Sequence, residues 1–148
     1  MDCSHRAEGV YDVAVVGLGP VGATLANLLA LDGLSVIAFD RDAEPYALPR
    51  AVHFDDEVMR VFQTIGLAEQ ILPFTHVSPG MHFVDAEGRL FLDWSRPREL
   101  GPNGWNISYR FHQPDLERIL RAGARAHASI DIRLRSDVYS VEDRKSVV

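Results

Sequence analysis

The chain has very little cysteine and no long apolar run. Its single thiol, Cys3 among 148 residues, excludes an internal disulfide and a cysteine-ligated zinc cluster. The histidines show no metal-ligand spacing, so we expect no metal site. No apolar stretch reaches the length of a signal peptide or a membrane span. We therefore expect a cytoplasmic protein without membrane contact, which fits the sparse cysteine.

Basic charge is also scarce. Fifteen Lys and Arg residues stand against 21 Asp and Glu, for a net charge of −6, and no basic stripe interrupts the chain. This distribution argues against a nucleic-acid surface. Hydrophobic residues make up 47% and charged residues 24%, as in an ordinary globular domain. The polar residues 1–10 are expected to form a disordered tail before it.

The first part of the chain predicts a strand, a helix and a second strand. Residues 11–16 form a short apolar run of the kind buried on both faces of a parallel sheet. Residues 20–31 carry leucines and alanines at helical spacing, and Gly33 is suited to end that helix. Residues 34–39 form a second apolar run. Together these segments predict a βαβ unit with a right-handed crossover.

The turn inside this unit has the spacing of a dinucleotide-binding loop. Gly17 permits the tight turn, Gly19 lets phosphate oxygens approach the backbone, and Gly22 allows close packing of helix on sheet. The helix N-terminus offers free N–H donors to an anion. Asp40, 23 residues after Gly17, is placed to accept hydrogen bonds from ribose hydroxyls. The predicted cofactor-binding residues here are Gly17, Leu18, Gly19, Pro20, Val21, Gly22 and Asp40.

The rest of the chain predicts a second layer. A helix is expected over 55–65, with acids in its first turn that suit the helix dipole, and another from residue 113, with strands over 130–134 and 138–142. Residues 80–95 predict a β-hairpin with a glycine in its turn. An antiparallel hairpin does not belong in a doubly wound parallel sheet, so we interpret it as the start of an inserted layer.

Three blocks in fixed order carry a family resemblance. Over about residues 11–142 the chain resembles the N-terminal part of the single-component (class A) flavin-dependent aromatic hydroxylases. The blocks are residues 12–22, residues 49–60 with Gly66-Leu67, and residues 111–120. The resemblance implies an α/β, Rossmann-like FAD-binding domain of the glutathione-reductase type, formed by 11–78 and 107–148 and incomplete at its C-terminal end. The hairpin region 79–106 would then begin an antiparallel substrate-domain sheet.

The resemblance also implies roles for individual residues. The three loop glycines would hold the FAD pyrophosphate, and Asp40 would hold the ribose, where the family more often has Glu. Arg41 follows it as in many relatives, Arg50 would reach toward the pyrophosphate, and Gln113 would contact the cofactor. From the local sequence alone, Arg50 could equally be a solvated loop residue. Gln113 could simply begin the helix, since Gln before Pro is ordinary there, and this remains the less favoured alternative. No catalytic acid or base is assigned, because the cofactor carries the chemistry.

The activity implied is hydroxylation of a small phenolic substrate with O2 and with NADH or NADPH. The family has later Asp-Gly and Gly-Asp motifs, whereas this chain has Asp-Gly only at Asp32-Gly33 and no Gly-Asp. We therefore expect an N-terminal part that holds the ADP half of FAD and is itself inactive. Two alternatives remain open: an NAD-linked dehydrogenase, and a nucleotide-binding module without catalysis. The particular phenol, the choice of nicotinamide donor and the oligomeric state are not specified by the sequence.

Overall fold

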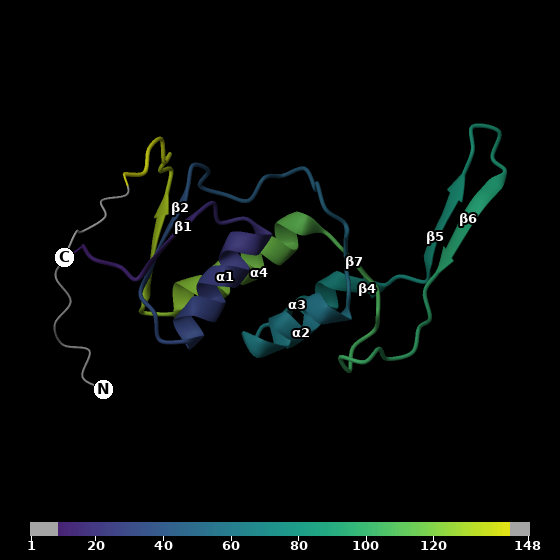
Figure 1. Ribbon diagram of the computed structural model, residues 1–148, viewed down its shortest axis with the longest axis horizontal. Helices are drawn as coiled ribbons and strands as arrows, with labels where there is room; N and C mark the ends of the chain where they lie inside the picture. Colours follow the sequence, from purple (N-terminus) through teal and green to yellow (C-terminus); the bar gives the residue numbers. More distant parts are fainter. Residues whose placement is uncertain (1–8, 143–148) are drawn as a thin grey trace.

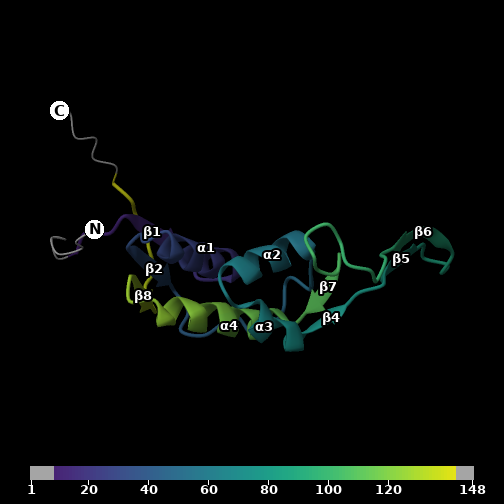
Figure 2. The same ribbon diagram turned by 90° about the horizontal axis from the view of Figure 1, so that it is seen from below.

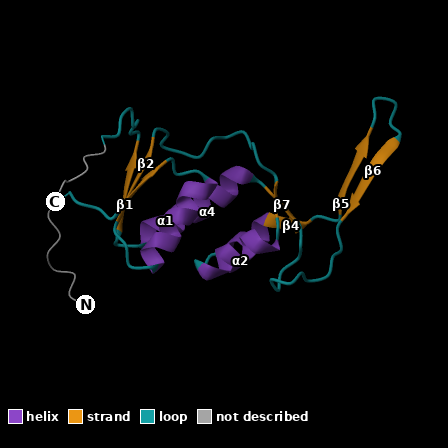
Figure 3. Cartoon of the chain, in the orientation of Figure 1, coloured by secondary structure: helices purple, strands orange, loops and turns teal. Residues whose placement is uncertain are grey.

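The computed structural model describes residues 9–142, in which the helices lie between a parallel sheet and two smaller groups of strands (Figure 1; Figure 3). A parallel sheet lies at one end and a β-hairpin at the other. Cys3 and most of the predicted N-terminal tail lie outside the described residues. Within residues 9–142, no helix combines the length and the apolar character needed to cross a bilayer.

The predicted βαβ unit is confirmed. Strand β1 (Val13–Val16) leads through helix α1 (Pro20–Leu31) to β2 (Val36–Asp40), and the two strands pair in parallel. Strand β8 (Ile130–Leu134) adds to the other side of β2, so β2 is central. All three strands therefore end at the same edge, next to the glycine loop that joins β1 to α1.

The prediction that the first strand is buried on both faces is wrong. β1 lies at the edge of the described sheet, and only Val15 in it is buried. Val16 is 61% exposed, and on the adjoining helix Val21 is 82% exposed. Alternate residues of a strand point to opposite faces, so the face that carries Val15 is covered and the face that carries Val16 is not. An apolar run does not by itself show which faces other segments cover. These residues line a pocket of about 440 Å³ in front of the glycine loop.

Helix α4 (Gln113–Ala126) packs along α1 and leads into β8. Figure 2 shows the two helices in adjacent layers. Asn27 Nδ2 donates a hydrogen bond to the Leu120 carbonyl across this contact at 3.0 Å. A Cβ at Gly123 would stand 3.0 Å from Asn27 Oδ1 and 2.6 Å from Leu67 Cδ1, so the missing side chain permits the close approach.

A second sheet, small and antiparallel, was not anticipated. It consists of β3 (His53–Phe54), β7 (Tyr109–Phe111) and β4 (Thr75–Val77), in that order. Strands of two or three residues are too short to show an alternating pattern. Helix α2 (Asp56–Thr64) packs on it, with the Phe54 and Phe62 rings 5.4 Å apart, and α3 (Ala68–Ile71) and the 3-10 helix η1 (Leu72–Phe74) follow.

The predicted hairpin is confirmed as β5 (Gly80–Val84) and β6 (Leu90–Ser95), and it projects away from the helices (Figure 1). Gly88 in its turn has φ +81°. The predicted strand over 138–142 is wrong, because the chain there is irregular. Tyr139 and Val141 are 95% and 84% exposed, and apolar alternation does not make a strand where the described chain offers no neighbour to pair with.

Candidate functional site

The glycine loop has the backbone geometry that its spacing predicts. Gly17 has φ +96°, a conformation that favours glycine, and its N–H donates to the Phe39 carbonyl of β2 at 2.8 Å. A Cβ at Gly22 would lie 1.9 Å from the Gly17 carbonyl oxygen. A Cβ at Gly19 would meet no atom of the described chain within 4 Å. The packing of the chain itself therefore requires glycine at position 22, whereas a side chain at position 19 would extend into open space.

Helix α1 begins at this open space without a cap. Its N-cap residue is Gly19, Pro20 occupies the first turn, and no side chain of residues 9–142 caps it. The first turn contains no acid. The N–H groups of Val21 and Gly22 are thus not used by a capping side chain, and the positive end of the helix dipole lies here. This arrangement suits a phosphate or pyrophosphate.

Asp40 is hydrogen-bonded directly to the glycine loop. Its Oδ2 accepts from the Leu18 N–H at 2.9 Å, and its Oδ1 accepts from the Asp42 N–H at 2.9 Å. The side chain is 12% exposed and stands at the carboxyl end of β2. A pocket of about 190 Å³ opens beside it between the ends of the parallel strands. The pocket is lined by Val16, Gly17, Phe39, Asp40, Arg41, Ser136, Asp137 and Val138.

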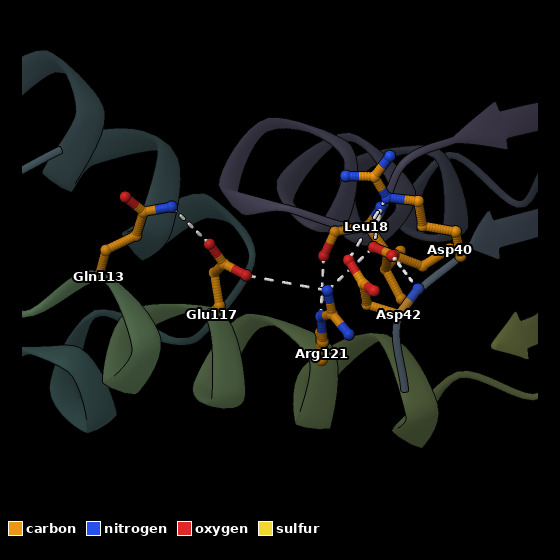
Figure 4. Close-up of polar contacts among 7 residues, drawn as sticks. Leu18, Asp40, Asp42, Gln113, Glu117 and Arg121 are labelled. Carbon is orange, nitrogen blue, oxygen red and sulfur yellow. Dashed lines mark hydrogen bonds and ion pairs between the residues drawn. The ribbon is translucent and has the colours of Figure 1, made fainter. Parts of the chain in front are cut away.

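Arg121 is a site residue that none of the sequence motifs indicates. From α4 its Nη2 donates to Asp40 Oδ2 at 2.9 Å and its Nε donates to the Leu18 carbonyl at 2.9 Å (Figure 4). The residue is 3% exposed. One signal was available: Gln113, Glu117 and Arg121 recur every fourth residue, which places three polar side chains on one face of the helix.

The side chains of Gln113, Glu117 and Arg121 connect Asp40 with the loop that carries Arg50. Gln113 Oε1 accepts from the N–H groups of Arg50 and Ala51, each at 2.8 Å. Its Nε2 donates to Glu117 Oε1 at 2.7 Å, and Glu117 Oε2 lies 3.8 Å from Arg121 Nη2 (Figure 4). Glu117 accepts and cannot donate when ionised, so it fixes which way the Gln113 amide points.

The two predicted arginines lie in exposed positions. The Arg50 guanidinium stacks over Tyr46, with Cζ 5.2 Å from the ring centroid, while its backbone is held by Gln113. The Arg41 side chain is 77% exposed, with Nε 3.5 Å from Asp42 Oδ2. The structure thus brings Asp40 to the glycine loop and Gln113 to the Arg50 backbone. The roles of the Arg41, Arg50 and Gln113 side chains toward a cofactor stay predictions.

The residues present fit the ADP half of FAD. The uncapped helix and the open side of Gly19 suit the pyrophosphate, and Asp40 beside the 190 Å³ pocket suits the adenosine. In the described part of the chain, no three His, Cys, Asp or Glu side chains gather as metal ligands.

Comparison with known proteins agrees with this geometry. A probable NADH-specific resorcinol 4-hydroxylase of Rhodococcus jostii is 41% identical over 135 residues, which are 90% of this chain and 25% of that protein. A 3-(3-hydroxy-phenyl)propionate/3-hydroxycinnamic acid hydroxylase of Paraburkholderia xenovorans is 38% identical over 136 residues, 91% of this chain and 22% of that protein. The chain thus spans about a quarter of the length of these relatives.

Solved structures share the fold. The p-nitrophenol 4-monooxygenase of Pseudomonas putida superposes with a TM-score of 0.74 at 21% identity, over 85% of this chain and 32% of that one. The family model described as "FAD binding domain" matches residues 10–148. The order of the three sequence blocks, the open glycine loop and the matched length lead to one assignment: the chain belongs to the family of FAD-binding domains.

Proposed function

We propose that this chain is the ADP-binding part of an FAD-dependent monooxygenase that hydroxylates a phenolic aromatic compound with NAD(P)H and O2. The observation that carries the proposal is the hydrogen bond between the Leu18 N–H and Asp40. This bond holds the acid that would bind the ribose against the loop that would bind the pyrophosphate. Both lie beside a helix N-terminus that no side chain of residues 9–142 caps.

The chain's own residues would bind and orient the cofactor. The N–H groups of Gly19, Val21 and Gly22 would donate to the pyrophosphate, while Leu18 and Pro20 shape the loop between them. Asp40 would accept from ribose hydroxyls, with Arg41 beside it. Gln113 would hold the Arg50 loop near the phosphates. FAD, when bound, supplies the electron transfer and the reaction with oxygen.

The names of the relatives support the finer parts of the proposal. The Rhodococcus relative is named a resorcinol hydroxylase and NADH-specific, which supports a phenolic substrate and NADH as donor. We assign residues 79–106 to a substrate domain and residues 11–78 and 107–148 to the FAD-binding domain. We also propose a cytoplasmic location. Nothing in the comparisons favours the alternative of an NAD-linked dehydrogenase.

The activity is tested on the full-length natural protein. NADH and NADPH oxidation and O2 uptake are followed with no phenol, with resorcinol and with 3-(3-hydroxyphenyl)propionate. We expect oxidation to rise severalfold or more when an accepted phenol is added, with a hydroxylated product. NADH oxidation that no phenol stimulates, in a protein saturated with FAD, would refute the monooxygenase proposal. The 148-residue chain alone is expected to bind FAD or ADP without turnover.

A further inference from the structure

We infer that Arg121 is a positioning residue of the cofactor site: it orients both the Asp40 carboxylate and the Leu18–Gly19 peptide for the ADP part of FAD. The inference rests on the proposed function. Arg121 lies 81 positions from Asp40 and 103 from Leu18, and its side chain reaches both at 2.9 Å (Figure 4).

The three residues form a closed hydrogen-bonded ring. Leu18 N–H donates to Asp40 Oδ2, Arg121 Nη2 donates to the same oxygen, and Arg121 Nε donates to the Leu18 carbonyl. The N–H and the C=O of Leu18 therefore both have hydrogen-bond partners, Asp40 and Arg121. The ring lies in the interior, since Leu18 is fully buried and Arg121 is 3% exposed.

The Leu18 carbonyl determines where the Gly19 N–H points. In a trans peptide, the C=O of one residue and the N–H of the next point in opposite directions, and the described chain has no cis bond. Arg121 holds this carbonyl toward α4, so the Gly19 N–H faces away from α4. Gly19 itself borders open space, because a Cβ built on it would meet no atom of the described chain within 4 Å, and we place the pyrophosphate there.

The same contact selects the oxygen that Asp40 presents to the ribose. Oδ2 accepts two hydrogen bonds, from Leu18 and Arg121. Oδ1 accepts from the Asp42 N–H and keeps a second lone pair for a ribose hydroxyl. Arg121 therefore determines how the carboxylate is turned, even though it need not touch the cofactor.

The need for a guanidinium follows from the geometry. Two donors in a fixed fork reach a carboxylate and a carbonyl at once, which the single ammonium of lysine does poorly. The arrangement has a cost, because Nη1 of Arg121 is buried without a hydrogen-bond partner in the described part of the chain. Asp40, together with Glu117 at 3.8 Å, compensates the buried charge.

The test compares the variants R121K, R121M and R118M in the full-length natural protein. Arg118 is the matched control, since it lies on the same helix but is 60% exposed and pairs with Asp115. The readouts are the FAD dissociation constant, from flavin fluorescence, and the melting temperature of the apoprotein. We expect R121K to bind FAD about tenfold more weakly, the effect of one lost hydrogen bond to a charged group. R118M should bind FAD with the dissociation constant of the wild-type protein.

A double-variant cycle separates positioning from general destabilisation. If Arg121 acts through Asp40, the variant R121M/D40N should bind FAD more tightly than the product of the two single penalties predicts. Should R121M fail to fold, R121K, which keeps the charge, decides the question. An affinity within twofold of wild type in R121K, or strictly multiplicative penalties in the cycle, would overturn the inference. A wild-type protein that binds no FAD would instead overturn the proposed function.

Discussion

Helices α1 and α2 begin in opposite ways. The N-cap residue of α2, Asp55, accepts a hydrogen bond from the Val58 N–H at 3.0 Å, and Asp56 accepts from the Asn103 side chain at 2.9 Å. The N-cap residue of α1 is Gly19, and no side chain of the described chain caps that helix. At the start of α2, Asp55 accepts from one backbone donor and acids occupy the positive end of the dipole, so the chain's own residues fill this position. α1 leaves both available to a ligand.

The acids at 55–57 mark the same difference between the two helix starts. Three successive acids raise the possibility of a metal site, and we interpreted them as a response to the helix dipole. The structure agrees with this interpretation for Asp55, because its carboxylate caps the N-terminus of the helix. The Asp56 carboxylate accepts a hydrogen bond from the Asn103 side chain. Acids at a helix start and glycines at a helix start therefore indicate different roles for the same backbone feature.

The largest loss of FAD affinity and of stability is expected for the variant G22A. Its Cβ would lie 1.9 Å from the Gly17 carbonyl oxygen, a backbone atom, so the loop must shift. We expect FAD binding to weaken by more than about a hundredfold and the unfolding free energy to fall by about 2–4 kcal/mol. Flavin titration and chemical denaturation measure the two effects. Wild-type affinity in G22A would show that close packing of loop on helix does not position the cofactor.

G19A should affect the ligand more than the fold. The added methyl meets no atom of the described chain within 4 Å, and Gly19 has φ −72°, which alanine adopts readily. Loss of a good N-cap residue lowers stability by less than about 1 kcal/mol. We expect FAD to bind about tenfold more weakly, because the methyl occupies the space that phosphate oxygens approach. Equal losses of stability in G19A and G22A would contradict this division of roles.

D55A should show the opposite pattern with the smallest effect. Removing the cap of α2 is expected to lower the unfolding free energy by about 1 kcal/mol and to leave FAD affinity unchanged. D55N, which keeps a capping oxygen, serves as the control and should retain most of the stability. A loss of FAD affinity in D55A at temperatures well below unfolding would mean that α2 contributes to the site.

Local signals were sufficient for much of the fold. The βαβ unit followed from two apolar runs around a glycine loop, and the hairpin from its glycine turn. The Asp40 contact with the loop agreed with the motif spacing. Each of these features depends on residues close in sequence or on a fixed crossover length.

Long-range features were not accessible. The strands β3, β4 and β7 are too short for a periodic pattern and form only because distant segments meet. The exposure of β1 depends on which distant segments cover each of its faces, and the predicted strand over 138–142 lacks a neighbour among the described residues. Arg121 reaches Asp40 across 81 positions, a contact that helix periodicity indicates but cannot assign to a partner.

We expect the open start of α1 and Asp40 to bind the ADP part of FAD. The most direct measurement is calorimetric titration of the full-length natural apoprotein with FAD, ADP and NAD. We expect one FAD site per chain, competition by ADP at the same site, and NAD binding at least about a hundredfold weaker than FAD binding. Tight NAD binding without FAD binding would contradict it.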